Sequence, residues 1–126
     1  MHMQTILIVD DEPQVRRLLE RVLHSAGFDV LTAECGLDAI SISLDHPGRI
    51  SLLITDINLP GMTGWTLADE ITEIEPELPV LFMSGGCPER NFDSDGHSEF
   101  LAKPFTPNTL LLEVSHLLGA SQDKVS

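Results

Sequence analysis

The chain has 126 residues, 42% hydrophobic and 21% charged, a length and composition that predict one globular domain with a substantial core. Its formal net charge is −13, from 20 acidic and 7 basic residues, so its surface repels nucleic acid and anionic lipid. No apolar run is long enough to span a bilayer, and no signal-peptide pattern is present. We therefore expect a cytoplasmic protein that binds neither nucleic acid nor membrane directly.

The first half of the chain alternates apolar runs with amphipathic segments. The apolar runs, which predict buried β-strands, are residues 5–9, 29–33 and 50–56. Gly27 ends the first predicted helix, whose inward-facing residues are Val15, Leu18, Leu19, Val22 and Leu23. The second predicted helix runs from Gly36 to about Leu44, and its apolar face consists of Leu37, Ile40 and Leu44.

The second half continues the alternation. A third helix is predicted from Gly64 to Glu75, with an inward face made of Leu67, Ala68, Ile71 and Ile74. Two further strands are predicted at residues 79–84 and 99–102. The apolar residues of the last predicted helix are Leu110, Leu111, Val114, Leu117 and Leu118. Residues 119–126 are expected to form a flexible tail, and residues 1–3 a short leader without a role.

The segment between the last two strands, residues 85–98, contains three glycines and one proline and only Phe92 as a large apolar residue. Glycine costs roughly 1 kcal/mol and proline about 3 kcal/mol relative to alanine at a helix position. We therefore expect at most a short, fraying turn in this segment.

Five strands alternating with helices predict an α/β fold, in which a parallel sheet is covered by helices on both faces. Right-handed crossovers leave few topologies, and the flavodoxin-like, doubly wound order 2-1-3-4-5 is a common one. This order separates Cys35 and Cys87 by three strands, roughly 14 Å at about 4.8 Å per strand. Because the Cα atoms of a disulfide lie within about 7 Å of each other, we expect two free thiols.

Carboxylates follow the first and third strands of this sheet. Asp10 and Asp11 follow the first strand, and Asp56 ends the third. These strands are neighbours in the predicted order, so the three acids converge at the carboxyl edge of the sheet, where open α/β folds bind ligands. Three adjacent carboxylates repel one another unless a cation joins them. With only oxygen ligands on offer, a hard cation is indicated, and Mg²⁺ fits best.

Two further polar residues are predicted at the same edge. Ser84 ends the fourth strand and Lys103 follows the fifth. A hydroxyl and an ammonium facing a metal-bound carboxylate supply the donors and the positive charge that a phosphoryl group requires. Asp56 would then be the nucleophile that forms an aspartyl phosphate.

These landmarks resemble those of the receiver domain of bacterial two-component response regulators. The matching stretches, which span about residues 5–118, are residues 8–11, Asp56 with residues 59–64, residues 83–85 and residues 103–105. No single stretch is decisive. With Asp56 and residues 59–64 counted separately, however, five landmarks in order at strand ends are highly specific.

The resemblance implies a role for each matching residue. Asp56 would accept the phosphoryl group, and Ser84 and Lys103 would hold its oxygens. Asp11 would bind Mg²⁺ directly and Asp10 through water, and the backbone carbonyl of Asn58 would be a further ligand.

Conformational switching is also implied by the resemblance. Ser84 and Phe100 would be the switch residues, and the Lys103–Pro104 bond matches one that is often cis in the family. The stretch from Ser84 to Lys103 departs from the family by being about one helical turn shorter. Because this region carries the family's output surface, the departure bears on the surface that faces the partner.

The resemblance implies a phosphorylation-dependent signalling switch and not an enzyme, apart from its own phosphotransfer and slow autodephosphorylation. Its phosphoryl donor would be a histidine kinase or a histidine phosphotransfer protein, and its downstream protein is unknown. One alternative is a Mg²⁺-dependent phosphohydrolase of small molecules, but that class has a second acid where this chain has Asn58. Another is a receiver-like protein-binding module that no longer uses phosphate. The chain would be either a stand-alone regulator or a receiver cut from a larger protein.

Overall fold

The computed structural model describes residues 4–85 and 98–123 of the chain. Cys87 and nearly all of the segment expected to form only a short turn lie outside these residues. Within them, strands and helices follow one another in the order predicted from the sequence. The strands are β1 (Thr5–Val9), β2 (Asp29–Ala33), β3 (Ile50–Asp56), β4 (Val80–Ser84) and β5 (Ser98–Ala102). The helices are α1 (Pro13–Ser25), α2 (Gly36–Asp45), α3 (Gly64–Ile74) and α4 (Pro107–Asp123).

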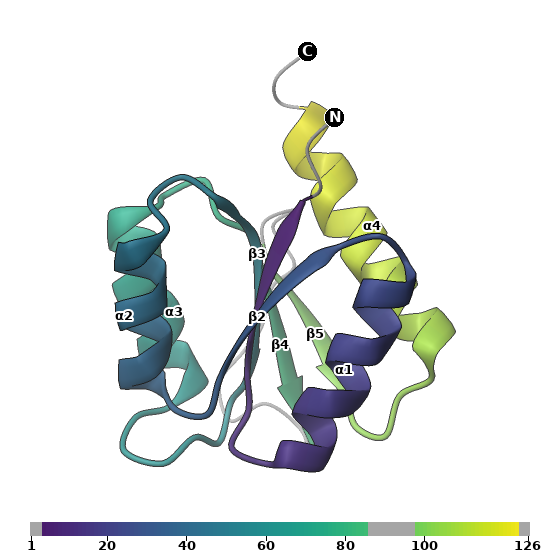
Figure 1. Ribbon diagram of the computed structural model, residues 1–126, viewed down its shortest axis with the longest axis horizontal. Helices are drawn as coiled ribbons and strands as arrows, with labels where there is room; N and C mark the ends of the chain where they lie inside the picture. Colours follow the sequence, from purple (N-terminus) through teal and green to yellow (C-terminus); the bar gives the residue numbers. More distant parts are fainter. Residues whose placement is uncertain (1–3, 86–97, 124–126) are drawn as a thin grey trace.

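The strands form one parallel sheet in the order β2-β1-β3-β4-β5, which confirms the predicted topology. Helices α1 and α4 cover one face of this sheet, and α2 and α3 cover the other (Figure 1). Because all five strands run the same way, their carboxyl ends meet at a single edge. The start of β1 and the end of α4 lie near the opposite edge (Figure 1).

Two hydrophobic cores flank the sheet, and alternate strand residues belong to each. Ile6, Ile8 and Ile54 point toward α1 and α4, where Leu19, Leu23 and Leu110 are buried. On the opposite face, the buried residues include Leu7, Val9, Leu53, Phe82, Trp65 and Ile71. The rings of Trp65 and Phe82 are 4.4 Å apart between centroids. The continuous apolar runs of the strands are explained by this burial on both faces.

The inward face of α2 differs from the predicted one. Leu37 and Leu44 are exposed, with 72% and 57% of their surface accessible, whereas Ala39 and Ser43 are buried. Small residues let α2 approach its neighbours closely, and a Cβ added at Gly36 would lie 2.6 Å from the Met62 side chain. Ile40 packs against the core as predicted, so the predicted inward face is wrong for Leu37 and Leu44 and right for Ile40.

Smaller differences occur at two other helices. Leu18 of α1 and Ile74 of α3, both predicted to face inward, each have 47% of their surface accessible because they lie at the margins of their buried stripes. Gly27 has a φ of 98° just after α1, the left-handed conformation with which a glycine ends a helix.

The last helix extends farther than the sequence predicts. It was expected to end before Gly119, but α4 continues to Asp123. Gly119 does not adopt a positive φ, so it lacks the conformation by which Gly27 stops α1. Among the described residues, no helix is long and apolar enough to cross a bilayer. Cys35 is a free thiol.

Candidate functional site

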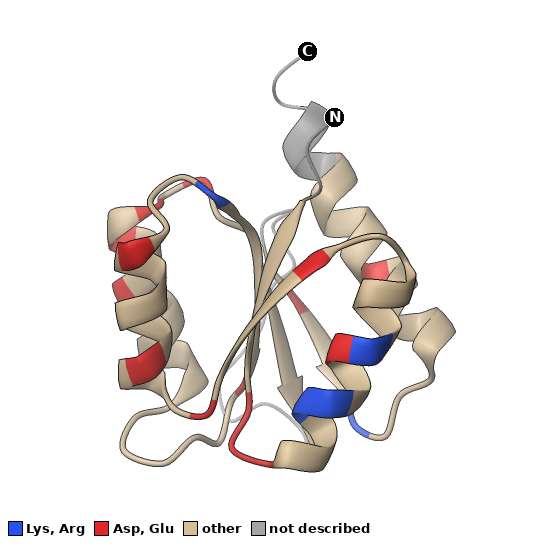
Figure 2. Ribbon diagram, in the orientation of Figure 1, with Lys and Arg blue, Asp and Glu red and all other residues tan. Residues whose placement is uncertain are grey.

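Polar side chains gather at the carboxyl edge of the sheet, in the loops that follow β1, β3 and β5. Figure 2 shows acidic residues in the loop that follows β1, and Asp56 is the last residue of β3. Lys103, in the loop after β5, supplies a cation at this edge, whereas Arg49, which precedes β3, lies at the opposite edge.

Asp10, Asp11 and Asp56 form the acidic cluster predicted from the sequence. Each offers a carboxylate oxygen, and these oxygens all lie within 4.8 Å of one another. Asp10 and Asp56 are buried, whereas Asp11 is exposed. Three hard oxygen donors at this separation suit a divalent cation, so the cluster could hold a metal ion.

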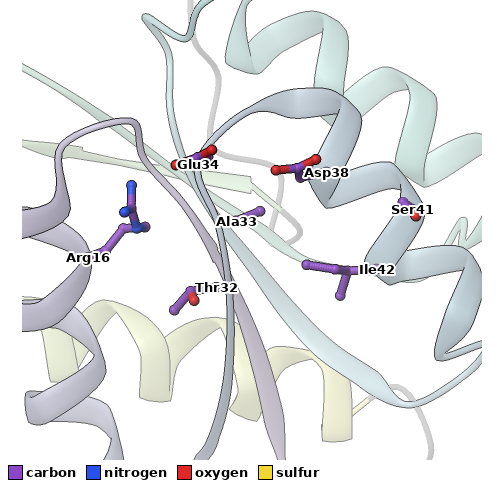
Figure 3. A pocket seen from close by; sticks show the side chains of 7 residues that line it. All are labelled: Arg16, Thr32, Ala33, Glu34, Asp38, Ser41 and Ile42. Carbon is purple, nitrogen blue, oxygen red and sulfur yellow. The ribbon is translucent and has the colours of Figure 1, made fainter.

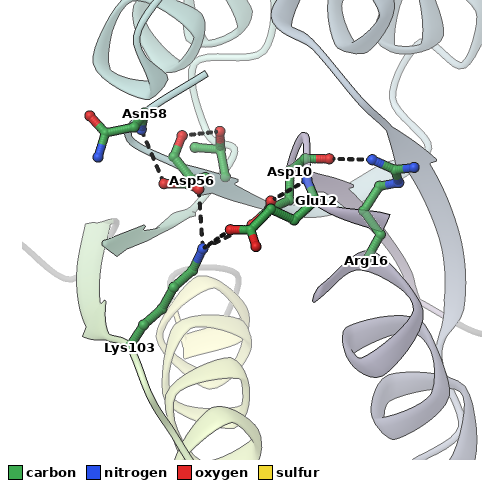
Figure 4. A network of polar contacts seen from close by, with 7 residues as sticks. Asp10, Glu12, Arg16, Asp56, Asn58 and Lys103 are labelled. Atoms are coloured by element: carbon green, nitrogen blue, oxygen red, sulfur yellow. Dashed lines mark hydrogen bonds and ion pairs between the residues drawn. The ribbon is translucent and has the colours of Figure 1, made fainter. Parts of the chain in front are cut away.

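Lys103 joins two of these acids. Its ammonium nitrogen lies 3.1 Å from Asp10 Oδ2 and 3.1 Å from Asp56 Oδ2 (Figure 4). Glu12 Oε1 is more distant, at 4.0 Å. Because the two nearer oxygens belong to buried carboxylates, the ammonium offsets the charge repulsion between them.

The pKa values of this network reflect burial and pairing together. Burial raises the pKa of the Asp10 carboxyl, against the opposing effects of the Glu12 amide and the Lys103 ammonium. Burial alone would lower the pKa of Lys103, but hydrogen bonds and charge interactions with Asp56 and Asp10 outweigh it. The net result is a raised Lys103 pKa, which keeps the ammonium charged.

The turn between β1 and α1 holds Asp10 at several atoms. Its carboxylate accepts a hydrogen bond from the Glu12 amide at 2.9 Å, and its backbone N–H donates to the carbonyl of Ala33 at 3.2 Å. Its backbone carbonyl accepts a hydrogen bond of 2.6 Å from Arg16 Nη1 (Figure 4). Pro13 then begins α1, where its missing N–H would have had no partner within the helix.

The turn after β3 fixes Asp56. The Asn58 amide donates to Asp56 Oδ1 at 3.0 Å, and the Ile57 amide donates to the Met83 carbonyl at 2.9 Å. Gly64, the first residue of α3, packs directly against this turn. A Cβ added there would lie 2.4 Å from the Asp56 carbonyl oxygen, too close for any side chain.

The other residues singled out from the sequence lie as follows. Ser84 is buried at the end of β4, and its carbonyl accepts a hydrogen bond of 2.8 Å from the Lys103 amide. Phe100 is half-buried in the middle of β5, opposite Phe82. Asn58 is exposed, and the Lys103–Pro104 peptide bond is cis. The structure thus brings Lys103 and the three acids together, with Ser84 tied to Lys103 through the backbone.

Sequence reasoning missed two residues of this network, Glu12 and Arg16. One signal was present for Arg16. It is the fourth residue of α1, where a cation is unfavourably placed in the field of the helix N-terminus. A cation in that position needs a compensating partner, and the Asp10 carbonyl supplies one.

A surface cavity of about 340 Å³ lies beside Arg16, lined by residues of α1, β2 and α2 and of the turn between β2 and α2. The Arg16 side chain forms one wall, and the other lining residues are Thr32, Ala33, Glu34, Asp38, Ser41 and Ile42 (Figure 3). Arg16 therefore contacts both this cavity and the turn that carries Asp10.

Comparison with known proteins identifies relatives along most of the chain. The family model described as the response regulator receiver domain matches residues 6–115. The response regulator receiver protein CpdR of Brucella abortus (strain 2308) is 36% identical over 122 residues, which cover 94% of this chain and 100% of CpdR. The sensor kinase CckA of the same organism is 33% identical over 117 residues, which cover 90% of this chain but only 12% of CckA.

Solved structures agree with this result. A response regulator receiver protein from Sinorhizobium medicae WSM419 superposes with a TM-score of 0.85 at 34% identity, covering 95% of this chain and 98% of that protein. The chain also matches several transcriptional regulators, of whose length it spans about half.

Proposed function

The chain belongs to the response regulator receiver family, and from this premise we propose that it is a phosphorylation-dependent switch that accepts a phosphoryl group on Asp56. One observation carries the proposal. The Asp56 carboxylate has two further carboxylates within 4.8 Å and the Lys103 ammonium 3.1 Å away. This places a nucleophilic oxygen beside both a possible cation site and a positively charged side chain.

The transfer would proceed at a carboxylate oxygen of Asp56. This oxygen forms a bond to phosphorus while the bond from phosphorus to the donor atom breaks, and the donor leaves with its electron pair. The attacking group is the carboxylate form of Asp56, whose oxygen carries the electron pair that bonds to phosphorus. Lys103 and Ser84 would then donate to the phosphoryl oxygens, and the backbone hydrogen bond between them keeps the two residues together.

The acidic cluster fits Mg²⁺ because its donors are hard carboxylate oxygens and Asp11 is open to solvent. Asp11 would bind the ion directly and Asp10 through water, and the Asn58 carbonyl is proposed as a further ligand. When bound, Mg²⁺ supplies positive charge that lets an anionic phosphoryl donor approach three carboxylates.

The proposed donor is a histidine kinase or a histidine phosphotransfer protein. The match to a stretch of a protein named as a sensor kinase supports this assignment. Ser84 and Phe100 are proposed as the residues whose rearrangement relays the phosphorylated state to a downstream protein. The net charge of −13 supports a protein partner and not a nucleic acid or an anionic membrane.

The proposal is tested by incubating the protein with acetyl phosphate and following its intact mass. We expect wild-type protein to gain one labile phosphate in the presence of Mg²⁺ and none in the presence of EDTA. Asp56→Asn should gain none, whereas Asp69→Asn, which changes an exposed acid on α3, should be labelled like wild type. Undiminished labelling of Asp56→Asn would falsify the assignment of the phosphoacceptor.

A further inference from the structure

Asp11 lacks a side-chain restraint of its own. No hydrogen bond or ion pair with another residue in the described part of the chain holds its carboxylate, although Asp10 and Asp56 are each held by several. Asp11 is also exposed. The position of its carboxylate therefore depends on the backbone of the β1–α1 turn.

That backbone is held from both sides at Asp10. The N–H of Asp10 is bound by β2 through the Ala33 carbonyl at 3.2 Å, and the Asp10 carbonyl is bound by Arg16 Nη1 at 2.6 Å. This carbonyl belongs to the peptide bond that leads to Asp11. Because a peptide unit is planar, fixing its oxygen fixes the direction in which the chain enters Asp11.

We propose that Arg16 is a positioning residue for the metal site, which it serves by orienting the Asp10–Asp11 peptide so that Asp11 faces Asp10 and Asp56. The inference rests on the metal site of the proposed function. It assigns Arg16 a contribution to Mg²⁺ affinity although its contact is with the backbone carbonyl of Asp10 (Figure 4), and no ion pair joins it to Asp10, Asp11 or Asp56 in the described part of the chain.

The surroundings of Arg16 favour a role in geometry over one in charge. Arg16 Nη1 donates to a backbone carbonyl, that of Asp10, and no ion pair joins the guanidinium to a carboxylate among the residues that the structure describes. The Arg16 side chain also lines a cavity open to solvent (Figure 3), so a shorter side chain there leaves no closed void. A substitution at Arg16 therefore tests the hydrogen bond with little effect on packing.

The test is a calorimetric Mg²⁺ titration of wild-type protein, Arg16→Met and Arg17→Met. Methionine keeps most of the stem and removes both the donor and the charge. We expect Arg16→Met to bind Mg²⁺ about tenfold more weakly, at the low end of the effects of indirect metal-site partners. Arg17 is an exposed neighbour, and its substitution removes the same charge. We expect Arg17→Met to stay within about twofold of wild type, because salt screens exposed charges.

A kinetic measurement separates positioning from general damage. If Arg16 acts only through metal affinity, Arg16→Met should need more Mg²⁺ for half-maximal labelling by acetyl phosphate but reach the wild-type rate at saturation. Arg16→Gln, whose amide ends two atoms short of the guanidinium nitrogen, is the second variant if Arg16→Met does not fold.

Three outcomes overturn the inference. They are wild-type Mg²⁺ affinity in the folded Arg16 variant, an equal loss in Arg17→Met, and a reduced rate that saturating Mg²⁺ does not restore. Failure of the proposed metal site looks different, because wild-type protein itself would then bind no Mg²⁺, and failure of the proposed phosphoacceptor would appear as undiminished labelling of Asp56→Asn.

Discussion

The Lys103 ammonium lies 3.1 Å from Oδ2 of Asp56, across 47 residues of chain. The same ammonium contacts Oδ2 of Asp10, so it is bonded to two of the three acids that are proposed to surround Mg²⁺. A metal ion that uses either of these oxygens has to share it with the ammonium or replace it. Lys103 is therefore a partner of these carboxylates in the metal-free site and a competitor of the metal ion for their oxygens.

This relationship predicts opposite effects on metal binding for two substitutions. Asp11→Ala removes a proposed ligand and should weaken Mg²⁺ binding strongly, whereas Lys103→Ala removes a competing cation and should leave it unchanged or tighter. Labelling of Lys103→Ala by acetyl phosphate should nevertheless be impaired, because the phosphoryl oxygens lose a donor. Metal titration and mass spectrometry of both variants check this. Wild-type Mg²⁺ affinity in Asp11→Ala would show that the site has been misplaced.

The raised pKa of Lys103 predicts a loss of stability at alkaline pH in metal-free buffer. Its folded-state pKa exceeds the unfolded value of 10.5, so its stabilising contribution is complete below about pH 10.5. That contribution is lost as the pH rises through the folded-state pKa, because Asp10 and Asp56 then lose their shared ammonium. Urea midpoints measured between pH 8 and 12 would reveal the decline.

Few other side chains titrate in this pH range, because the chain contains no tyrosine, one other lysine, Lys124, and two cysteines. Lys103→Met should be less stable than wild type at neutral pH and should show a shallower alkaline decline. Lys124→Met is the matched control and should decline like wild type. An identical decline in Lys103→Met would show that another group causes it.

Removing the exposed member of the cluster should slightly stabilise the metal-free protein. Asp11→Ala relieves repulsion with Asp10 and Asp56, so its melting temperature without Mg²⁺ should rise by a small amount. The gain in melting temperature on adding Mg²⁺ should shrink in the same variant. Asp69→Ala, which removes an exposed acid on α3, controls for net charge. A lower melting temperature for metal-free Asp11→Ala would indicate that Asp11 has a structural role.

Gly64→Ala should destabilise the protein, because the new Cβ would lie 2.4 Å from the Asp56 carbonyl oxygen, a backbone atom that cannot move aside alone. Overpacking of this kind costs about 1–3 kcal/mol. Gly119→Ala is the matched control, because Gly119 lies within α4 with no atom within 4 Å of its added Cβ. This control should stabilise the protein by about 0.5–1 kcal/mol. Denaturant unfolding of both variants decides the matter, and equal stabilities would contradict the close approach.

Much of the site could be predicted because its functional groups are side chains at the ends of strands. Asp56 directly ends an apolar run, and Lys103 follows another, so the sheet order alone brings them together. Arg16 could not be predicted in this way. Its partner is the backbone carbonyl of Asp10, and a backbone contact leaves no pattern of residue types.

The fold was predictable to a similar extent. Its prediction failed at α2, where close packing decides which residues are buried. Strand order follows from alternation and handedness, which are properties of the whole chain. The inward side of α2 depends on how closely that helix approaches its neighbours. The small residues Ala39 and Ser43 are buried there, whereas the larger Leu37 and Leu44 are exposed. Periodicity measures hydrophobicity along a helix, whereas close packing selects for size.

The contact between Lys103 and Asp10 joins residues 93 positions apart, and it has a consequence for the order in which the protein is made. During synthesis, the ribosome adds Asp10, Asp11 and Asp56 to the chain well before it adds Lys103. Until β5 docks beside β4, the emerging chain carries its acids without the cation that pairs with them. Lys103 is therefore the last of the four charged groups of the site to be synthesised. A truncated chain that stops before β5 would retain all three acids but could not form this pair.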